Sequence, residues 1–290
     1  MKTTNFITLP DGRRLSYAEF GKPDGYPVIH FHGGGGSRLE PLLLGDELIS
    51  QFGIRLIAPD RPGFGQSDFQ PNRDFSDYPK DVIFLANTLG LDKFSVLGIS
   101  SGGGYVSACA AKIPHRLINA VIVSGMWYVD SFAGLPMLTR CLYALAKTFP
   151  LLYRVVLKLS LPFYQGDPAK VLAALKKQAP AADYAVLKAQ NRIVPFCKST
   201  IEAMRQDAKG PAWDFQLYLR PWDFRIEEIQ IPLNFFHGEQ DKTVTIALAK
   251  RYINRLPTAK LGTYPDEGHI SIVVNQFETI VQALKGERSD

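Results

Sequence analysis

One serine in this chain lies in a spacing that can activate its hydroxyl. Ser100 is at the centre of segment 98–102 (Gly-Ile-Ser-Ser-Gly), between an apolar, β-prone run (94–97) and a helix-compatible run (105–112). Glycines two positions before and after a serine permit a sharp strand-to-helix turn that exposes the side chain. A Cβ at either glycine would collide with neighbouring backbone in so tight a turn. Ser101 lacks a glycine two positions before it, so we predict Ser100 as the nucleophile.

A serine hydroxyl needs a base within hydrogen-bonding reach, and the base needs a group that orients it. Of the five histidines, His269 is the candidate base, because it ends the loop 264–269 (Tyr-Pro-Asp-Glu-Gly-His) after the last predicted strand. Ligands of open α/β sheets bind at this carboxyl edge. The other four histidines are expected to be structural, one of them bracing the glycine-rich loop that follows it: His30, His32, His115 and His237.

The orienting acid is expected on a second loop at the same edge. Segment 238–242 (Gly-Glu-Gln-Asp-Lys) follows a predicted strand and supplies two candidates, Glu239 and Asp241. Asp241 is preferred because it ends the turn, just before the next predicted helix. The order serine, acid, histidine along the chain also favours it. Without that order, Asp241 would be interpreted as an ordinary helix cap.

A tetrahedral intermediate needs two donors directed at its oxygen, which together form an oxyanion hole. The backbone N–H of Ser101 is one candidate, because it begins the helix after the nucleophile, where the helix dipole favours negative charge. The second is expected from the glycine run 33–36, which lets backbone approach a ligand closely, and we assign it to Gly34. The alternative is that this run is only a flexible turn.

Other kinds of site are not indicated. Two glycine-rich turns miss the dinucleotide fingerprint, since Arg38 and Asp68 stand where its third glycine would be. No His, Asp and Glu cluster has metal-ligand spacing. The formal net charge of +5 comes without a long basic run interleaved with aromatics, which argues against nucleic acid. We expect a small-molecule substrate and neither cofactor nor metal.

The elements that must position these residues alternate between strand and helix. From Pro27 to Ser124 the alternation predicts an α/β fold: a mostly parallel, twisted sheet with helices on both faces. Two extended runs before it, joined by Asp11-Gly12, predict a hairpin. The alternation resumes at Ile231. The chain is therefore predicted to divide into a first core part (1–125), a helical lid insertion (126–228) and a second core part (229–290).

The predicted lid is rich in leucine, tyrosine and basic residues. Residues 126–228 hold 14 Lys and Arg against 9 Asp and Glu, so the lid carries the excess positive charge of the chain. One interpretation of this charge is a solvated helical face. The more specific interpretation is a preference for anionic or interfacial substrates. Apolar lid positions including Phe149, Leu152 and Phe163 indicate either a greasy pocket or core packing.

The composition indicates the cellular compartment in which we expect the protein to work. Hydrophobic residues make up 46% and charged residues 21%, values typical of a soluble globular protein. Residues 1–7 lack the apolar core of a signal peptide, and no uncharged apolar stretch is long enough to span a bilayer. The cysteines are odd in number and have no metal-like spacing: Cys109, Cys141 and Cys197. We predict reduced packing residues in a cytoplasmic protein.

These motifs together resemble the α/β-hydrolase superfamily, in its lid-bearing serine hydrolase branch. The resemblance covers most of the core and rests on the loop 32–36, the turn 60–67, the segment 98–102, the loop 237–241 and the pair Gly268-His269. It implies the same catalytic triad, Ser100, Asp241 and His269, and the same oxyanion hole, the N–H groups of Gly34 and Ser101. In that family the turn 60–67 is mostly structural.

Departures from the family pattern narrow the expected chemistry. Haloalkane dehalogenases and epoxide hydrolases resemble this chain but carry aspartate where Ser100 stands. Prolyl aminopeptidases are similar but need acidic lid residues, whereas this lid is basic. We expect a cofactor-free esterase that forms an acyl-enzyme on small to medium apolar esters. The alternatives are a hydrolase of another bond (an N-terminal peptide, a diketone C–C bond or a thioester) and a ligand sensor with little turnover.

Overall fold

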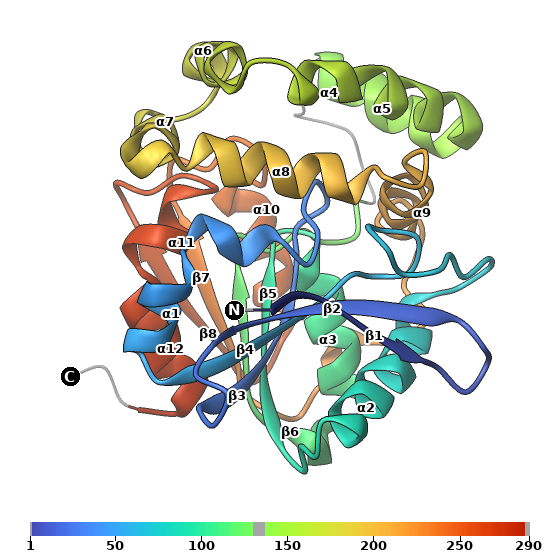
Figure 1. Ribbon diagram of the computed structural model, residues 1–290, viewed down its shortest axis with the longest axis vertical. Helices are drawn as coiled ribbons and strands as arrows, with labels where there is room; N and C mark the ends of the chain where they lie inside the picture. The colour runs from blue at the N-terminus through green and yellow to red at the C-terminus, as the bar shows by residue number, and fades with distance from the viewer. Residues whose placement is uncertain (1, 130–136, 288–290) are drawn as a thin grey trace.

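The computed structural model describes residues 2–129 and 137–287, in which an eight-stranded sheet has the order β1-β2-β4-β3-β5-β6-β7-β8 (Figure 1). The first two strands form the predicted hairpin, and β2 also pairs antiparallel with β4. All other neighbours in the sheet run parallel. The strands are β1 (Lys2–Thr8), β2 (Arg14–Gly21), β3 (Tyr26–Phe31), β4 (Ile54–Pro59), β5 (Phe94–Ile99), β6 (Leu117–Val123), β7 (Leu233–Gly238) and β8 (Ala259–Tyr264).

Helices cover both faces of this sheet, as the strand–helix alternation predicts. The apolar sides of α2 (Tyr78–Thr88), α3 (Gly102–Lys112) and α10 (Ile246–Ile253) pack on one face. On the other face lie α1 (Asp46–Gln51), α11 (Ser271–Asn275) and α12 (Phe277–Lys285). The central strand β5 is buried along its whole length, because layers on both faces exclude water from it. The prediction of fold class is confirmed.

Helices α4 to α9 follow β6 and precede β7, and they form the upper layer in Figure 1. Most of their prolines stand at or near helix starts, where the missing N–H costs little, whereas Pro162 lies inside α5. Their bounds are α4 (Met137–Thr148), α5 (Pro150–Gln165), α6 (Pro168–Gln178), α7 (Ala181–Lys188), α8 (Ile193–Ala203) and α9 (Lys209–Leu217). No described helix has the length and apolar run needed to cross a membrane.

The sequence pattern predicts one helix over 39–52 and another over 270–284, and each is interrupted in the structure. The helix expected over 39–52 divides at Gly45, whose φ of +86° is a backbone conformation that ends one helical segment before the next begins. The helix expected over 270–284 divides at Gln276, between α11 and α12.

The cysteine prediction is wrong for one residue. Cys109 and Cys197 are buried, but Cys141 is exposed on α4, so only two of the three are packing residues. All three are free thiols.

Candidate active site

The segment around Ser100 forms a strained turn between β5 and α3. Ser100 has a φ of +52°, which is in the left-handed region that non-glycine residues rarely adopt. Its N–H donates to the Val123 carbonyl at 2.9 Å, and its carbonyl accepts from Gly103 and Met126. These bonds tie the turn to the end of β6, so the surrounding backbone holds the strained conformation.

The two flanking glycines are required for steric reasons. A Cβ at Gly98 would lie 2.6 Å from the Gly102 carbonyl oxygen, and a Cβ at Gly102 would lie 2.0 Å from the Phe31 carbonyl oxygen. Both separations are far below van der Waals contact. Helix α3 can therefore begin this close to β3 and β5 only because neither position has a side chain.

The predicted acid and base form a hydrogen-bonded pair. His269 Nδ1 lies 2.7 Å from Asp241 Oδ2, while the other carboxylate oxygen accepts the N–H groups of Thr243 and Val244 at 2.8 and 2.9 Å. The Asp241 side chain is fully buried, whereas Glu239 is exposed. The structure thus selects Asp241 over Glu239 as the partner of the imidazole, and leaves His269 Nε2 available as an acceptor.

Opposing effects set the protonation of this pair. Burial of the His269 ring disfavours its charged form, but the nearby Asp241 carboxylate outweighs burial, with further help from Asp183 and Glu40. The pKa of His269 is therefore raised above its ordinary value of 6.5. Burial likewise acts to raise the pKa of Asp241, but His269 and the Val244 N–H outweigh it, and the pKa of Asp241 is lowered. Asp241 is a carboxylate across the neutral range.

One cavity of about 520 Å³ joins the predicted residues. Ser100, Ser101, Gly34 and His269 all line it, and Asp241 lies behind the imidazole. No hydrogen bond joins the Ser100 hydroxyl to the His269 ring in the described part of the chain. Such contacts commonly tighten only when a substrate is bound. The cavity wall is mainly apolar, and α4, α5, α6 and α8 supply much of it: Tyr143, Tyr153, Leu157, Tyr164, Leu175 and Phe196.

The two predicted oxyanion donors are neighbours. A Cβ built on Gly34 would lie 3.2 Å from Ser101 Oγ. Among the described residues, neither the Gly34 N–H nor the Ser101 N–H donates a hydrogen bond, whereas the Gly33 N–H is taken by Glu40 Oε1 at 2.9 Å. The two N–H groups are thus available to a ligand in the cavity.

The remaining histidines lie mostly in structural settings. His32 Nδ1 contacts the Gly33 carbonyl at 2.8 Å and its other nitrogen accepts from the Arg61 N–H, so it does brace the glycine loop. His237 Nε2 donates to the Val244 carbonyl at 2.8 Å. His30 Nε2 lies 2.8 Å from Glu40 Oε2, which makes Glu40 a link between β3 and the Gly33 N–H.

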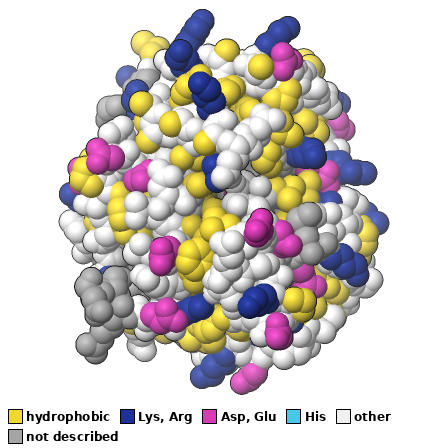
Figure 2. Space-filling model, turned by 60° about the vertical axis from the view of Figure 1, so that its left-hand side comes forward, with side chains coloured by type: hydrophobic (Ala, Val, Ile, Leu, Met, Phe, Trp, Pro, Cys, Tyr) yellow, Lys and Arg dark blue, Asp and Glu magenta, His cyan; other side chains and the backbone are white. Residues whose placement is uncertain are grey.

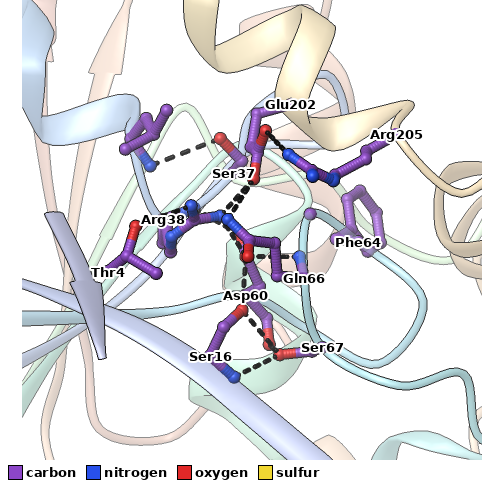
Figure 3. Close-up of polar contacts among 12 residues, drawn as sticks. Thr4, Ser16, Ser37, Arg38, Asp60, Phe64, Gln66, Ser67, Glu202 and Arg205 are labelled. Atoms are coloured by element: carbon purple, nitrogen blue, oxygen red, sulfur yellow. Dashed lines mark hydrogen bonds and ion pairs between the residues drawn. The ribbon is translucent and has the colours of Figure 1, made fainter. Parts of the chain in front are cut away.

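The turn 60–67 contains a buried charged residue, Asp60, that belongs to an ion-pair network with α8. Figure 3 shows that Asp60 accepts hydrogen bonds from Arg38, Ser16 and Gln66. Its Oδ2 atom lies 2.7 Å from both Arg38 Nη1 and Ser16 Oγ. Arg38 also contacts Glu202 of α8 at 2.5 Å. This network connects the turn to α8, which agrees with a structural role for the turn.

A second buried charge cluster supports the oxyanion region, and sequence reasoning missed it. Arg61 donates to Ser101 Oγ at 3.2 Å and to the His32 carbonyl, and its Nε lies 2.8 Å from Asp214 Oδ2 on α9. Arg73 contacts the other oxygen of Asp214. Burial acts to raise the pKa of Asp214, but the two guanidinium groups outweigh it and lower that pKa. Sequence spacing offers no signal for partners this far apart.

Sequence reasoning also missed Asp183 of α7. Its buried carboxylate accepts three backbone N–H groups of the histidine loop: from Ile270 and Ser271 on Oδ1, at 2.9 and 2.8 Å, and from His269 on Oδ2, at 3.1 Å. A Cβ at Gly268 would lie 2.5 Å from Asp183 Oδ1. The glycine of the Gly268-His269 pair therefore makes room for this carboxylate.

The strand order and the turn after β5 are those of one class of proteins. A mostly parallel sheet with a serine on a strained turn after a central strand, followed in the chain by an acid and then a histidine, is the arrangement of α/β hydrolases. The family model described as alpha/beta hydrolase fold matches residues 26–276, so the chain belongs to this family and is a hydrolase.

Individual relatives agree with this assignment. The chain is 27% identical over 298 residues to the bifunctional esterase/perhydrolase of Acinetobacter calcoaceticus, covering 96% of this chain and 97% of that one. It is 36% identical over 128 residues to a non-heme chloroperoxidase of Streptomyces lividans, a match that spans 41% of this chain and 44% of the relative.

Solved structures share the fold. A hydrolase fold protein of Nakamurella multipartita superposes with a TM-score of 0.73 at 19% identity, over 97% of this chain and 99% of the other. A thermophilic esterase of Thermogutta terrifontis superposes with a TM-score of 0.69 at 20% identity, over 98% and 97%.

Proposed function

We propose that the protein is a serine esterase that cleaves small to medium apolar carboxylic esters through an acyl-enzyme. One observation carries the proposal: the strained Ser100 and the Asp241-bound His269 open onto the same apolar cavity. A hydroxyl beside an imidazole that a buried carboxylate orients is the arrangement that makes serine a nucleophile.

The proposed reaction has two halves. His269 Nε2 takes the proton of Ser100 as Oγ forms a bond to the ester carbonyl carbon, and the Gly34 and Ser101 N–H groups donate to the developing oxyanion. The C–O bond to the alcohol then breaks, and His269 gives that oxygen its proton. Water, deprotonated by His269, attacks the acyl carbon, and Ser100 leaves with the proton. Asp241 stays ionised and orients the imidazole throughout.

The cavity supports the proposed substrate class. A volume of about 520 Å³ is within the range of pockets that hold small and drug-sized molecules. Asp214 is a cavity-lining acid of the insertion, but Arg61 and Arg73 occupy its carboxylate. This pairing disfavours recognition of a substrate amine, and with it the alternative of cleavage at a peptide N-terminus.

The proposal includes the division of the chain. Residues 1–125 and 229–290 form the hydrolase core, and residues 126–228 form a helical lid over the carboxyl edge of the sheet. Supporting it, α4 to α9 are consecutive in the chain between β6 and β7, and several of them line the cavity. We also propose that the enzyme is cytoplasmic, where its three free thiols stay reduced.

Replacement of the nucleophile tests this function. Ser100→Ala should lower kcat for p-nitrophenyl esters by about 10⁵-fold or more, the scale of loss when a serine nucleophile is removed. A fluorophosphonate probe should label the native protein at Ser100 and leave the variant unlabelled. Ser76→Ala is the matched control, because Ser76 Oγ makes no hydrogen bond among the described residues and Ser76 does not line the cavity. Normal turnover by folded Ser100→Ala would overturn the proposal.

A panel of substrates then separates the bonds that this triad could break. Matched acyl esters, thioesters, amides and a diketone should be turned over in that order of preference, with esters first. Turnover of the diketone or of the amides without turnover of the esters would favour the corresponding alternative function. Tight binding of panel members with labelling but negligible turnover would favour a ligand sensor.

A second candidate activity is perhydrolysis, which the name of the near full-length Acinetobacter relative favours. Here hydrogen peroxide, in place of water, attacks the acyl-enzyme, so the acyl carbon gains an O–OH group and Ser100 is released. Adding peroxide to an ester reaction should produce peracid at the expense of free acid. Ser100→Ala should produce none, and an absence of peracid with the native protein would exclude this activity.

A further inference from the structure

Helix α5 presents an apolar stripe to solvent. Leu151 and Leu159 are 76% and 74% exposed. Outside α4, α5 and the link between them, only Phe6 and Ile118 are exposed large apolar side chains among the described residues. Three of the apolar lid positions noted in the sequence are therefore neither pocket nor core. The full stripe consists of Phe149, Leu151, Leu152, Val155, Val156, Leu159 and Phe163.

The opposite side of the same helix faces the cavity. Tyr153, Leu157, Ser160 and Tyr164 line the cavity that contains Ser100. Helix α5 is thus apolar on two sides, of which the described part of the chain covers only one. Uncovered apolar surface of this extent marks a binding site for a lipid or protein surface.

The charge of the surrounding helices shows what could cover the stripe. Residues 137–178, which comprise α4 to α6, hold seven Lys and Arg and a single acid, Asp167. Asp207, after α8, pairs with Arg154 and Lys158 and offsets part of this charge. Figure 2 shows apolar and basic side chains intermixed at the top of the molecule, where Figure 1 places these helices.

We propose that the surface of α4, α5 and α6 docks on an anionic lipid bilayer. Apolar side chains beside basic ones suit the boundary between headgroups and acyl chains, where both kinds of contact are satisfied. A second copy of this chain is a poorer occupant, because two such faces would bring like charges together. Docking would bring the cavity wall that α5 supplies next to the membrane.

Vesicle sedimentation tests the surface without reference to catalysis. The native protein should sediment with vesicles of phosphatidylcholine mixed with phosphatidylglycerol, weakly with phosphatidylcholine alone, and less as salt is raised. Leu159→Glu should reduce apparent affinity at least tenfold, because it places a charge in the stripe. Ile118→Glu is the matched control, since Ile118 is 43% exposed on β6 and should bind as the native protein does.

Three outcomes would overturn this proposal. One is no sedimentation with either vesicle. Another is equal binding to both vesicle compositions. The third is a dimer, measured by light scattering, that Leu159→Glu dissociates, because a second copy would then cover the stripe.

An independent observation concerns Asp183, and this second inference rests on the proposed function. Its carboxylate, 2% exposed, comes from α7 in the insertion and binds the backbone of the loop that carries the imidazole. Movement of α7 would leave three N–H groups of this loop without their acceptor, which is costly for buried groups. The placement of α7 and the placement of His269 are therefore coupled.

We infer that Asp183 is a positioning residue that makes the His269 loop competent only while α7 is docked. Four groups act on the imidazole: Asp241 at 2.7 Å, the Asp183 carboxylate through the loop backbone, and Glu40 and His237 at longer range. Among the described residues, the Asp183 carboxylate hydrogen-bonds only to backbone, so it fixes the loop while Asp241 fixes the ring.

Two substitutions separate positioning from general stability. Asp183→Asn keeps the side-chain volume and one acceptor but opposes the His269 N–H with a second donor. It should lower kcat about tenfold with little change in KM, and Asp183→Ala should lower it further. Both should lower the pKa of the His269 ring, read by NMR titration with His269→Gln as the assignment. Asp207→Asn is the matched control, because Asp207 is an exposed lid carboxylate.

The measurements distinguish the proposed esterase function from the positioning role of Asp183. A native protein without ester turnover would overturn the proposed function, while a shifted His269 titration in Asp183→Asn would still support positioning. Folded Asp183→Asn with native kcat and an unchanged His269 titration would overturn the inference.

Discussion

At the residue scale, His269 combines a carboxylate partner on one nitrogen with a cavity on the other side. The raised pKa of His269 follows from Asp241 outweighing burial, so the ring holds its proton to a higher pH than free histidine does. A general base works only when unprotonated. As the proposed general base, His269 therefore needs a pH above its pKa for full activity.

The first prediction is a pH profile. The value of kcat/KM for a neutral ester should rise with pH through a midpoint above 6.5 and then level, because the base is freed as the ring loses its proton. Initial rates measured across the pH range would show it. An acid limb centred well below 6.5 would contradict the prediction.

The second prediction concerns the acid. Asp241→Asn should lower kcat by about 10³ to 10⁴-fold, because the amide no longer stabilises the charged imidazole or selects its tautomer. The acid limb of the remaining activity should move to lower pH, since the charge that raises the His269 pKa is gone. Glu239→Gln is the matched control, because Glu239 is exposed and should behave as the native protein.

At the element scale, the turn between β5 and α3 depends on close backbone approach. Helix α3 begins where a Cβ on Gly102 would lie 2.0 Å from backbone of β3. This approach sets where the Ser101 N–H and the Ser100 hydroxyl sit relative to the glycine loop.

The third prediction is the cost of filling that space. Gly102→Ala should lower the free energy of unfolding by about 3 kcal/mol, the upper range for overpacking, because rigid backbone must move. Urea unfolding measures it. Gly35→Ala is the control for stability, since a Cβ there meets nothing within 4 Å. A Gly102→Ala midpoint equal to that of the control would contradict the steric argument.

Local patterns in the sequence sufficed to predict the α/β core and to select the triad candidates. Ser100, Asp241 and His269 each follow a recognisable strand, so their shared edge could be predicted. The supports of the site could not, because their partners are remote: Asp183 lies 86 positions from His269, and Asp214 lies 153 from Arg61. Hydrophobic periodicity also does not reveal which apolar lid positions stay exposed, because the α5 stripe and the α5 cavity wall both include leucine and aromatic side chains.

At the scale of the whole molecule, buried charges join α8 and α9 to the segments around the sheet. Arg61 and Arg73 of the core meet Asp214 of α9, and Arg38 meets Glu202 of α8. Removing one member of a buried pair leaves its partner charged and unpaired. These contacts therefore matter to the stability of the complete protein.

The fourth prediction is acid-dependent stability. The folded-state pKa of Asp214 lies below 3.8, so its contribution is complete above that pH and is lost as pH falls further. Asp214→Asn should destabilise the protein by about 3 kcal/mol at neutral pH. The Tm difference from the native protein should shrink below about pH 3.8. A difference that stays constant with pH would contradict the ionised pair.

The order of the site residues along the chain has a consequence for biosynthesis. The turn that bears the hydroxyl leaves the ribosome early, whereas the imidazole emerges only after the whole insertion and the last two strands of the sheet. A nascent polypeptide therefore already contains α4 to α9 and the described strands of the sheet when the proposed base emerges, and only α11 and α12 follow it. Products of premature termination would carry the proposed nucleophile without the proposed base, and we expect them to be inert.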